Sequence, residues 1–441
     1  FQTPGMEEIR DRELVHACET TLAYRIENHS LHQEFNTAQQ HRPRLWRNRA
    51  GFNAIYCHGE LTALGYSADN IRRITTTPMN HVYGYIDIRT REGHNDPWSW
   101  NRIRRSAINW GNTHGMICVP GQYKRNQNSN ACFIPNLPGN KNTLFANCQS
   151  YPLQLYVDGV ITPNVSDEFR AWLLEDIEED QQPEALNLSH TFWYYFLAVS
   201  STPRYNEDRI SRYGQESRFP IPNYESQNND GQNIFAEYAR LGRFIRRLHS
   251  EIAMFNDNDE DEELQRLRTS VRDWLSINFQ NDAGENIGND FFVSGWATVE
   301  VHKIRPLTPT MESLPLADLL EEENENLTNL LGELDMENQD FIEVLGEHYV
   351  NLCLAPNVSI PRVPLSILSY SIGGQPVLQN WLSWRNRQQL GRQFNNDDRT
   401  ELINLISNIC TQILIGPRLN DLFDSVLENI RQYTWNLNEE D

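Results

Sequence analysis

The sequence predicts a mixed α+β fold, in which a β-containing lobe near the N-terminus precedes a largely helical remainder. Two observations support this fold class. Residues 36–150 are rich in Asn, Gln, Arg, Gly and Trp and contain only short apolar runs such as Gly51–Cys57 and Gly115–Pro120, which is typical of strands and loops. Later segments place apolar residues at helical spacing. The 441 residues can bury a sizeable core, and we expect two or three domains.

The stretch His190–Pro222 organises the rest of the chain. Its first part, Phe192–Val199, is an unbroken aromatic and aliphatic run that is too dense for a solvent-facing helix, and it predicts a central buried helix. Pro203 ends this helix, because proline cannot continue the hydrogen-bond ladder. A polar, arginine-containing turn is expected over Tyr205–Tyr213, and the prolines of 218–222 predict an extended exit.

The elements around this stretch follow from local patterns. Residues 1–35 predict a helical lead-in, with apolar side chains at a spacing of about 3.6 residues. Tyr151–Val157 predicts a strand, and Val165–Glu179 an amphipathic helix that Ser166 caps. Asn233–Glu251 predicts a strong helix with one apolar stripe.

The C-terminal part is predicted to mix strands and helices. Residues 285–310 predict strands, and residues 314–350 a long acidic helical stretch. Ser369–Arg392 predicts a strand, a Gly-Gly turn that needs unusual backbone angles and an amphipathic helix. Two apolar-periodic helices, 397–415 and 418–433, close the chain. The predicted division is a helical lead-in (1–35), a basic β-rich lobe (36–160), a helical core (161–255) and an acidic part with α/β and helical segments (256–441).

Charge is distributed unevenly along the chain. Residues 1–150 carry 17 Lys and Arg against 12 Asp and Glu, a net charge of +5, whereas residues 151–441 carry 21 against 48, a net charge of −27. Within residues 36–150 the contrast rises to 14 basic against 5 acidic residues. A basic N-terminal region followed by an acidic one is expected where the basic region binds an anionic polymer. The scarcity of lysine fits a high-salt organism and a lineage composition equally well.

Aromatic, basic and amide side chains alternate in the basic region. Trp98–Arg105 (WSWNRIRR) is followed by Asn109–Asn112 and Gln122–Asn126, and residues 41–49 (HRPRLWRNR) form a second basic cluster. Arg and Asn or Gln can read bases through paired hydrogen bonds, while other Arg and Lys neutralise phosphates. The alternative is that the tryptophans are core residues and the arginines a solvated face; the cluster as a whole favours a DNA-facing surface. The predicted DNA-binding residues are Arg42, Arg44, Arg47, Arg49, Arg89, Arg91, Asn101, Arg102, Arg104, Arg105, Asn112, Gln122, Lys124 and Arg125.

Catalytic and metal-binding motifs are weak throughout. Asn95–Trp98 (NDPW) has one proline where an adenine methyltransferase loop has two, and no glycine-rich turn precedes it. No P-loop is present, and Glu300–Lys303 (EVHK) has the wrong spacing for a restriction-type nuclease. The acidic run Asn256–Glu263 lacks the glycine of a calcium loop and is interpreted as a solvated loop or cap. We therefore expect no catalytic residue, metal or cofactor in this chain, which is then not an enzyme by itself.

The cysteines and the hydropathy of the sequence indicate the environment in which the protein works. Seven cysteines are scattered singly, without a CxxC pair, which favours a reducing, intracellular environment over disulfides or structural zinc. No apolar run approaches twenty residues, so we expect no membrane span, and the first residues do not combine a charged and an apolar segment, so we expect no secretory leader.

Five stretches of the sequence occur in an order that is similar to a known family. They are Tyr83–Arg89 (YGYIDIR), Ser150–Tyr156 (SYPLQLY), His190–Pro222, Phe235–His249 (with Gly242 and the closing His249) and Ser369–Arg387 (with Gly-Gly, Trp-Leu and Arg). Together they resemble the C-terminal target-recognition region of type ISP restriction–modification enzymes, over about residues 80–430. The first stretch lacks the Pro-Phe of the family, and Gln375 stands where Tyr is usual.

This resemblance implies a role in phage defence. Type ISP enzymes join nuclease, helicase, adenine methyltransferase and specificity parts in one chain, so methylation, cleavage and S-adenosylmethionine binding would belong to other domains. We expect a DNA sequence-recognition module in the prokaryotic cytoplasm. It would bind duplex DNA and position it for a methyltransferase domain in cis or in trans. The alternative of a different class is an acidic protein-interaction or inhibitory module that does not bind DNA.

Overall fold

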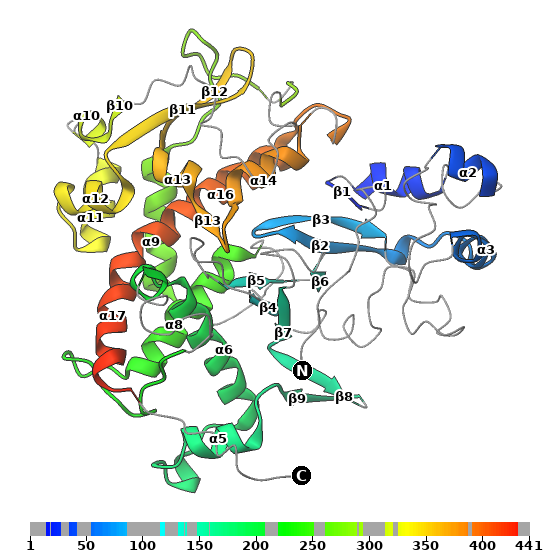
Figure 1. Cartoon of the computed structure of the whole chain (residues 1–441). Helices are drawn as coiled ribbons and strands as arrows, with labels where there is room; N and C mark the ends of the chain where they lie inside the picture. The colour runs from blue at the N-terminus through cyan, green and yellow to red at the C-terminus, as the bar shows by residue number, and fades with distance from the viewer. Residues whose placement is uncertain are drawn as a thin grey trace.

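The computed structural model of the chain has a mixed α+β fold, which confirms the predicted class (Figure 1). The structure describes residues 15–17, 19–27, 35–41, 54–85, 115–119, 131–135, 137–138, 148–157, 159–207, 219–250, 261–288, 291–293, 314–320, 325–386 and 390–430. Figure 1 shows the N-terminal helices and the first strands on one side of the molecule and most of the long helices on the other.

The centre of the helical body is the crossing of α6 (Ala185–Ser201) and α8 (Ile234–His249). At this crossing a Cβ atom on Gly242 would lie 1.8 Å from the carbonyl oxygen of Tyr194, so no side chain fits there. Next to it, the ring of Tyr195 stacks on that of Phe235 with centroids 4.6 Å apart. The predicted apolar stripe of α8 is confirmed, since its six residues are all buried: Phe235, Tyr238, Leu241, Phe244, Ile245 and Leu248. The crossing therefore depends on one glycine and on interlocking aromatic rings.

The predicted end of α6 is also confirmed. Thr202 is the C-cap residue, and its hydroxyl donates to the carbonyl oxygen of Ala198 (3.0 Å). Tyr205 is fully buried between the rings of Phe219 and Phe423. The break at Pro203 thus turns the chain back onto the helical body. The rest of the predicted polar turn, residues 208–213, lies outside the described residues, as do residues 214–218.

Three further helices pack around this centre: α9 (Glu262–Leu275), α16 (Asn396–Leu414) and α17 (Gly416–Glu428). The last two confirm the predicted closing helices. By length and composition, the described stretch Asn396–Glu428 is apolar enough to cross a membrane, but 72% of its apolar window is buried inside the protein. This is the burial of a core helix.

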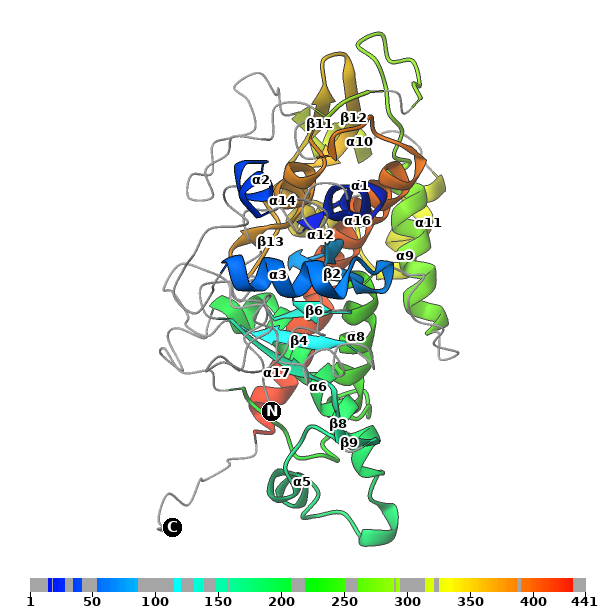
Figure 2. The same cartoon turned by 90° about the vertical axis from the view of Figure 1, so that its right-hand side faces the viewer.

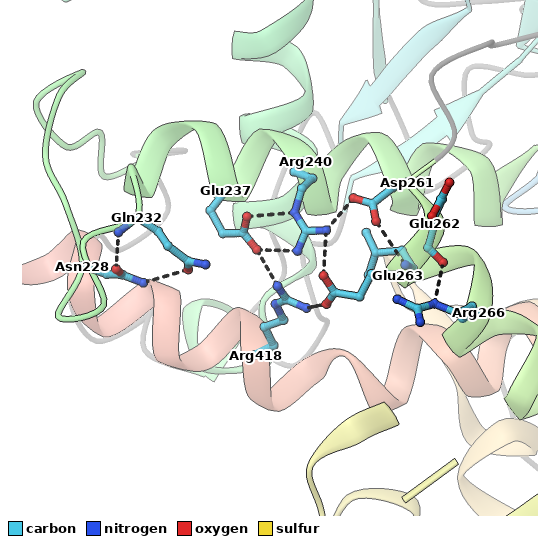
Figure 3. Close-up of polar contacts among 10 residues, drawn as sticks. Asn228, Gln232, Glu237, Arg240, Asp261, Glu262, Glu263, Arg266 and Arg418 are labelled. Atoms are coloured by element: carbon cyan, nitrogen blue, oxygen red, sulfur yellow. Dashed lines mark hydrogen bonds and ion pairs between the residues drawn. The ribbon is translucent and has the colours of Figure 1, made fainter. Parts of the chain in front are cut away.

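An ion-pair network joins α8, α9 and α17 (Figure 3). Arg240 donates to both carboxylate oxygens of Glu237 (2.8 Å each) and to Asp261 (2.5 Å). Arg418 donates to Glu237 (2.8 Å) and Glu263 (2.6 Å). Burial alone would raise the pKa of Glu237, but the two arginines outweigh it and lower that pKa below its ordinary value. Part of the predicted acidic run is therefore structural, because Asp261 also caps α9.

The strands of the lobe form small sheets against this body. One sheet has the order β1 (Val15–His16), β3 (Asn80–Tyr85), β2 (Ile71–Thr77) and β6 (Leu137–Pro138), and another β5 (Cys132–Ile134), β4 (Met116–Val119) and β7 (Gln149–Pro152). The pairs are antiparallel except for β2 with β6. A separate hairpin joins β8 (Gln154–Val157) to β9 (Val160–Pro163). The predicted strand Tyr151–Val157 is thus split at Leu153 between two sheets.

The C-terminal region contains a mixture of short elements. They are α10 (Leu316–Leu320), α11 (Glu325–Leu334), α12 (Asn338–Leu345), α13 (Leu365–Ser369), α14 (Val377–Trp384), the sheet β10 (Leu314–Pro315), β11 (His348–Ala355) and β12 (Val358–Pro364), and the pair β13 (Ser371–Ile372) and β14 (Gln375–Pro376). Gly373 and Gly374 form the predicted turn, with φ of 59° and 73°. Figure 1 and Figure 2 both show the hairpin of β11 and β12 at one end of the molecule and that of β8 and β9 towards the opposite end.

Several sequence predictions were wrong in detail. The described part of the run Gly51–Cys57, residues 54–57, is helical rather than extended, because it begins the helix α3 (Ala54–Leu64). In the lead-in, α1 (Glu19–Ile26) is helical as predicted, but Val15 and His16 pair with β3. The described part of the acidic stretch 314–350 is not one helix: it begins in β10, contains α10, α11 and α12, and enters β11 after Gly346, at φ 87°, terminates α12.

Other predictions hold only in part. Ser166 caps α5 (Asp167–Leu173) as predicted, accepting from the N–H of Phe169 (3.2 Å), but this helix ends six residues early. Most of the predicted strand region 285–310 lies outside the described residues. A large core cluster runs from Met79 to Val426, and a smaller one, which includes Leu22 and Tyr85, lies under α1, α3 and α2 (Phe35–His41). The division into four parts stays a prediction.

Candidate nucleic-acid interface

The predicted DNA-binding residues all lie outside the described residues. They occupy three connections of the lobe. Arg42, Arg44, Arg47 and Arg49 lie between α2 and α3; Arg89, Arg91, Asn101, Arg102, Arg104, Arg105 and Asn112 lie between β3 and β4; Gln122, Lys124 and Arg125 lie between β4 and β5. The structure therefore describes the scaffold from which these segments leave, and the segments themselves stay a prediction.

The strands at the two ends of the longest connection, β3 and β4, are anchored by buried contacts. Tyr85, at the end of β3, is buried, stacks on Tyr66 (6.0 Å between centroids) and accepts a hydrogen bond from Asn70 (3.4 Å). At the start of β4, Gly115 has φ of 80°, and a Cβ there would lie 2.3 Å from the ring of Phe133. Both ends of the long basic connection are thus held at fixed positions.

A pair of buried histidines joins the lobe to the helical body. His81 of β3 donates from Nε2 to the carbonyl oxygen of His249 at the end of α8 (2.9 Å). Its Nδ1 accepts from the hydroxyl of Thr75 on β2 (2.9 Å). His249 accepts at Nδ1 from the backbone N–H of Phe133 on β5 (3.0 Å) and donates from Nε2 to Gln412 of α16 (2.9 Å). Two sheets and two helices therefore meet at these two rings.

This geometry requires a neutral imidazole at His249, because its Nδ1 accepts from a backbone N–H, and it fits a neutral imidazole at His81. Each ring has one nitrogen that donates and one that accepts, and a second proton would remove the acceptor. Burial, followed by the positive charge of Arg73, lowers the pKa of His81 to about 3. Burial lowers the pKa of His249 to about 4. Hydrogen bonding and desolvation thus agree on the neutral state, which fits a structural role for the pair.

Arg385 forms a second link between lobe and body. Its guanidinium, only 2% exposed, lies 3.8 Å from the ring centroid of Trp381 and donates to the side chain of Asn80 on β3 (2.9 Å). It also donates to Glu401 of α16 (2.7 Å), which Arg73 of β2 contacts from the other side (3.4 Å). The β2–β3 hairpin is therefore fixed to α14 and α16 by buried charge-assisted bonds.

A cavity of about 260 Å³ lies at this junction. Its walls come from the β2–β3 turn, the end of α8, α14 and α16: Met79, His81, Leu248, His249, Ser250, Trp381, Thr400, Glu401, Asn404, Leu405 and Asn408. Within the described part of the chain, no group of three or more His, Cys, Asp or Glu side chains is arranged to hold a metal ion. The cavity therefore offers amide and hydroxyl groups rather than a metal site.

The role of the junction residues was not predicted from the sequence. His249 closes the Phe235–His249 stretch, and Arg385 follows the Trp-Leu pair of the last stretch, so both carried a signal in the resemblance. Gly242 belongs to the same set. In the structure these three residues pack helices and join the lobe to the body. None of the three is a base-reading candidate.

Comparison with known proteins supports the fold. No protein-family model matches the chain, and no curated protein does. Among solved structures, it is similar to DrdV in a cryo-electron-microscopy structure of a DrdV–DNA complex, with a TM-score of 0.53 and 12% identity over 95% of this chain. It is also similar to the ATP-dependent type ISP restriction–modification enzyme LlaBIII bound to DNA, with a TM-score of 0.50 and 10% identity over 96% of this chain.

The matched regions are parts of much larger proteins. This chain covers 35% of the DrdV chain and 23% of the LlaBIII chain. A third similar structure is a nuclease-deletion mutant of the type ISP enzyme LlaGI in complex with a DNA substrate mimic, with a TM-score of 0.48, 12% identity and coverage of 98% of this chain and 33% of that one. The similarity to LlaBIII shows that the chain has the fold of a segment of a type ISP restriction–modification enzyme, as the order of its sequence motifs predicted.

Proposed function

We propose that this chain is a DNA sequence-recognition module of a restriction–modification system, which binds duplex DNA through its strand-containing lobe. The observation that carries the proposal is the fold. Over 95% and 96% of its length the chain is similar to DrdV and LlaBIII, and both of those structures contain DNA. The excess of basic residues over 36–150 supplies the charge that a DNA-binding lobe needs.

The position of the predicted DNA-binding residues supports the same function. By their positions in the sequence, all of them lie on three connections of the lobe, and the strands at the ends of the longest connection, β3 and β4, are held by buried contacts. Recognition residues on loops that a rigid scaffold positions are a common arrangement. In this proposal Arg, Asn and Gln of the three connections enter the major groove, while further Arg and Lys contact phosphates.

The acidic helical body has a different part in this proposal. It braces the lobe and docks on a methyltransferase domain, in cis or in trans, which carries S-adenosylmethionine and methylates adenine. The chain covers 35% of DrdV, which leaves room for such a domain in a protein of that size. In this proposal the buried hydrogen bonds of His81, His249 and Arg385 hold the lobe at a fixed position relative to the body.

The experiment that tests this function is a salt titration of binding to random-sequence duplex DNA. The variant R102A/R104A/R105A is compared with the wild type and with R170A/R266A/R362A, which removes the same charge from surface arginines of the body. Binding through phosphates predicts a log–log slope that is shallower by about 0.9 for each phosphate that is no longer neutralised. We expect this change in the first variant and none in the control. Absence of wild-type binding even at low salt would contradict the proposal.

A further inference from the structure

The junction cavity is small and lies where helices of the body meet the lobe. Its described walls come from α8, α14, α16 and the turn between β2 and β3, and its volume is about 260 Å³. Sites for drug-sized molecules are commonly larger, at about 300–1,000 Å³. The cavity is therefore suited to a single ring system rather than to a larger ligand.

Most of the polar side chains in the described lining already form hydrogen bonds within the protein. They are His81, His249, Ser250, Thr400, Glu401 and Asn408. The two histidines use both ring nitrogens. Glu401, the one carboxylate of this lining, is paired with Arg385 and Arg73. The described lining therefore presents no unpaired charge to a phosphate or a metal ion.

Asn404 is the exception among these polar side chains. It is half-buried on α16, and its carboxamide has no hydrogen-bond partner among the described residues. Thr400, Asn404 and Asn408 follow one another at four-residue spacing, so they share the face of α16 that borders the cavity. A carboxamide carries N–H donors beside a carbonyl acceptor. Asn404 can therefore form two hydrogen bonds to one edge of a ligand.

The rest of the described lining is apolar. It consists of Met79, Leu248, Trp381 and Leu405, none of which is more than 5% exposed. The guanidinium of Arg385 lies 3.8 Å from the ring centroid of Trp381 and holds the indole in place. Such walls favour a ligand whose faces are weakly polar. A flat ring with polar atoms at its edge fits both the walls and Asn404.

Met79 contributes to this wall from an unusual backbone conformation. It follows Pro78 in the two-residue turn between β2 and β3, and its φ is 57°. Turns with proline at the first central position and a positive φ at the second usually have glycine or asparagine at the second. Met79 instead has a long side chain, which is buried in the lining. The strained position fits a wall that contacts a ligand, because backbone strain is concentrated at binding sites.

We propose that the junction cavity binds a single nucleobase, with Asn404 hydrogen-bonded to its edge and the apolar walls against its faces. A nucleobase has weakly polar faces, and its edge carries donors beside acceptors. Asn forms paired hydrogen bonds with adenine in this way, so adenine matches the carboxamide directly. A free nucleoside and an unpaired base in DNA both present this group. The site is independent of the proposed contacts with duplex DNA, in which the bases stay paired.

The first test measures the binding of four nucleosides (adenosine, guanosine, cytidine and thymidine) to the full chain by saturation-transfer NMR titration. The control N338A, which removes an exposed asparagine of α12, should bind adenosine as the wild type does. N404A should bind adenosine about tenfold more weakly, because it loses both hydrogen bonds of the carboxamide. Absence of binding of all four nucleosides to the wild type, or equal affinities of N404A and N338A, would overturn the proposal.

The variant N404D separates a contact with the base from a structural role of Asn404, and it provides the same test if N404A does not fold. A carboxylate keeps the shape of the side chain but only accepts hydrogen bonds. It can accept from the two adjacent N–H groups of guanine, whereas it loses one of its two bonds to adenine. We therefore expect the ratio of guanosine affinity to adenosine affinity to rise about tenfold in N404D. An unchanged ratio would contradict the pairing of Asn404 with a base.

A competition experiment identifies the source of the base. A DNA duplex with one unpaired adenine and the fully paired duplex are each added to the protein with adenosine bound. Displacement by the first duplex alone assigns the site to an unpaired base of DNA, and displacement by neither assigns it to a free nucleoside. Equal displacement by both would overturn the base pocket, because the adenosine would then occupy a general DNA-binding surface. If the protein binds no duplex DNA at all, the proposed function falls while binding of adenosine through Asn404 still stands.

Discussion

The helical body and the strand lobe differ in how their residues are constrained. In the body, Gly242 touches the backbone of Tyr194, and Tyr205 fills a gap between two rings. In the lobe, short strands such as β4, four residues long, are linked by the connections that hold the predicted basic residues. The chain is similar in fold to DrdV and LlaBIII at 12% and 10% identity. This fits a body that a few packing requirements fix and lobe connections that tolerate changes in sequence.

The comparison predicts that the body is most sensitive at the helix crossing. In G242A the added methyl would meet the Tyr194 carbonyl at 1.8 Å and force α6 and α8 apart. We expect a loss of about 3 kcal/mol in the free energy of unfolding, measured by denaturant titration, despite the higher helix propensity of alanine. In the control G332A, the new methyl meets nothing within 4 Å on the exposed side of α11. That variant should gain up to about 1 kcal/mol. Equal effects of the two changes would contradict the close crossing.

The junction predicts a smaller effect that depends on pH. His81 and His249 have pKa values of about 3 and about 4 in the folded protein, below the ordinary value of 6.5. Between about pH 4 and pH 6.5 the unfolded chain binds more protons than the folded one. The free energy of unfolding therefore falls as the pH is lowered through this range. The expected slope is about 1.4 kcal/mol per pH unit for each histidine. In H249Q, measured by denaturant titration at several pH values, one histidine's share of this slope should disappear.

The carboxylates of the ion-pair network provide the control for that measurement. Glu237 and Asp261 have lowered pKa values, so their contribution is present above their unfolded values near 4 and is lost only as pH falls further. The variant E237Q should therefore keep the wild-type slope between about pH 4.5 and 6.5 and differ below it. A wild-type slope in H249Q over that window would contradict the neutral, buried histidine pair.

Local patterns predicted the elements that depend on neighbouring residues. The dense run Phe192–Val199, the stop at Pro203, the stripe of α8 and the turn at Gly373 and Gly374 were all correct, because each follows from spacing or from the backbone limits of Pro and Gly. The helix α3 was missed because its apolar residues do not gather on one face, as the exposure of Ile55 and Tyr56 shows.

The junction could not be predicted, because its contacts are distant in the sequence. His249 meets Phe133 across 116 residues, and Arg385 meets Asn80 across 305. No periodic pattern in the sequence indicates such pairs. Only the resemblance to the family, in the stretches that contain His249 and Arg385, marked these residues. The predicted DNA-binding residues stay a prediction, since all of them lie outside the described residues.

Amide hydrogen exchange with and without duplex DNA tests the central claim most directly. The protein is incubated with a duplex at low salt, where binding has been confirmed by anisotropy, and exchange is followed by mass spectrometry along the whole chain. DNA recognition by the lobe predicts slower exchange in the segments 42–49, 89–112 and 122–125 on addition of DNA. Unchanged exchange in all three segments, under conditions in which DNA is bound, would contradict the account.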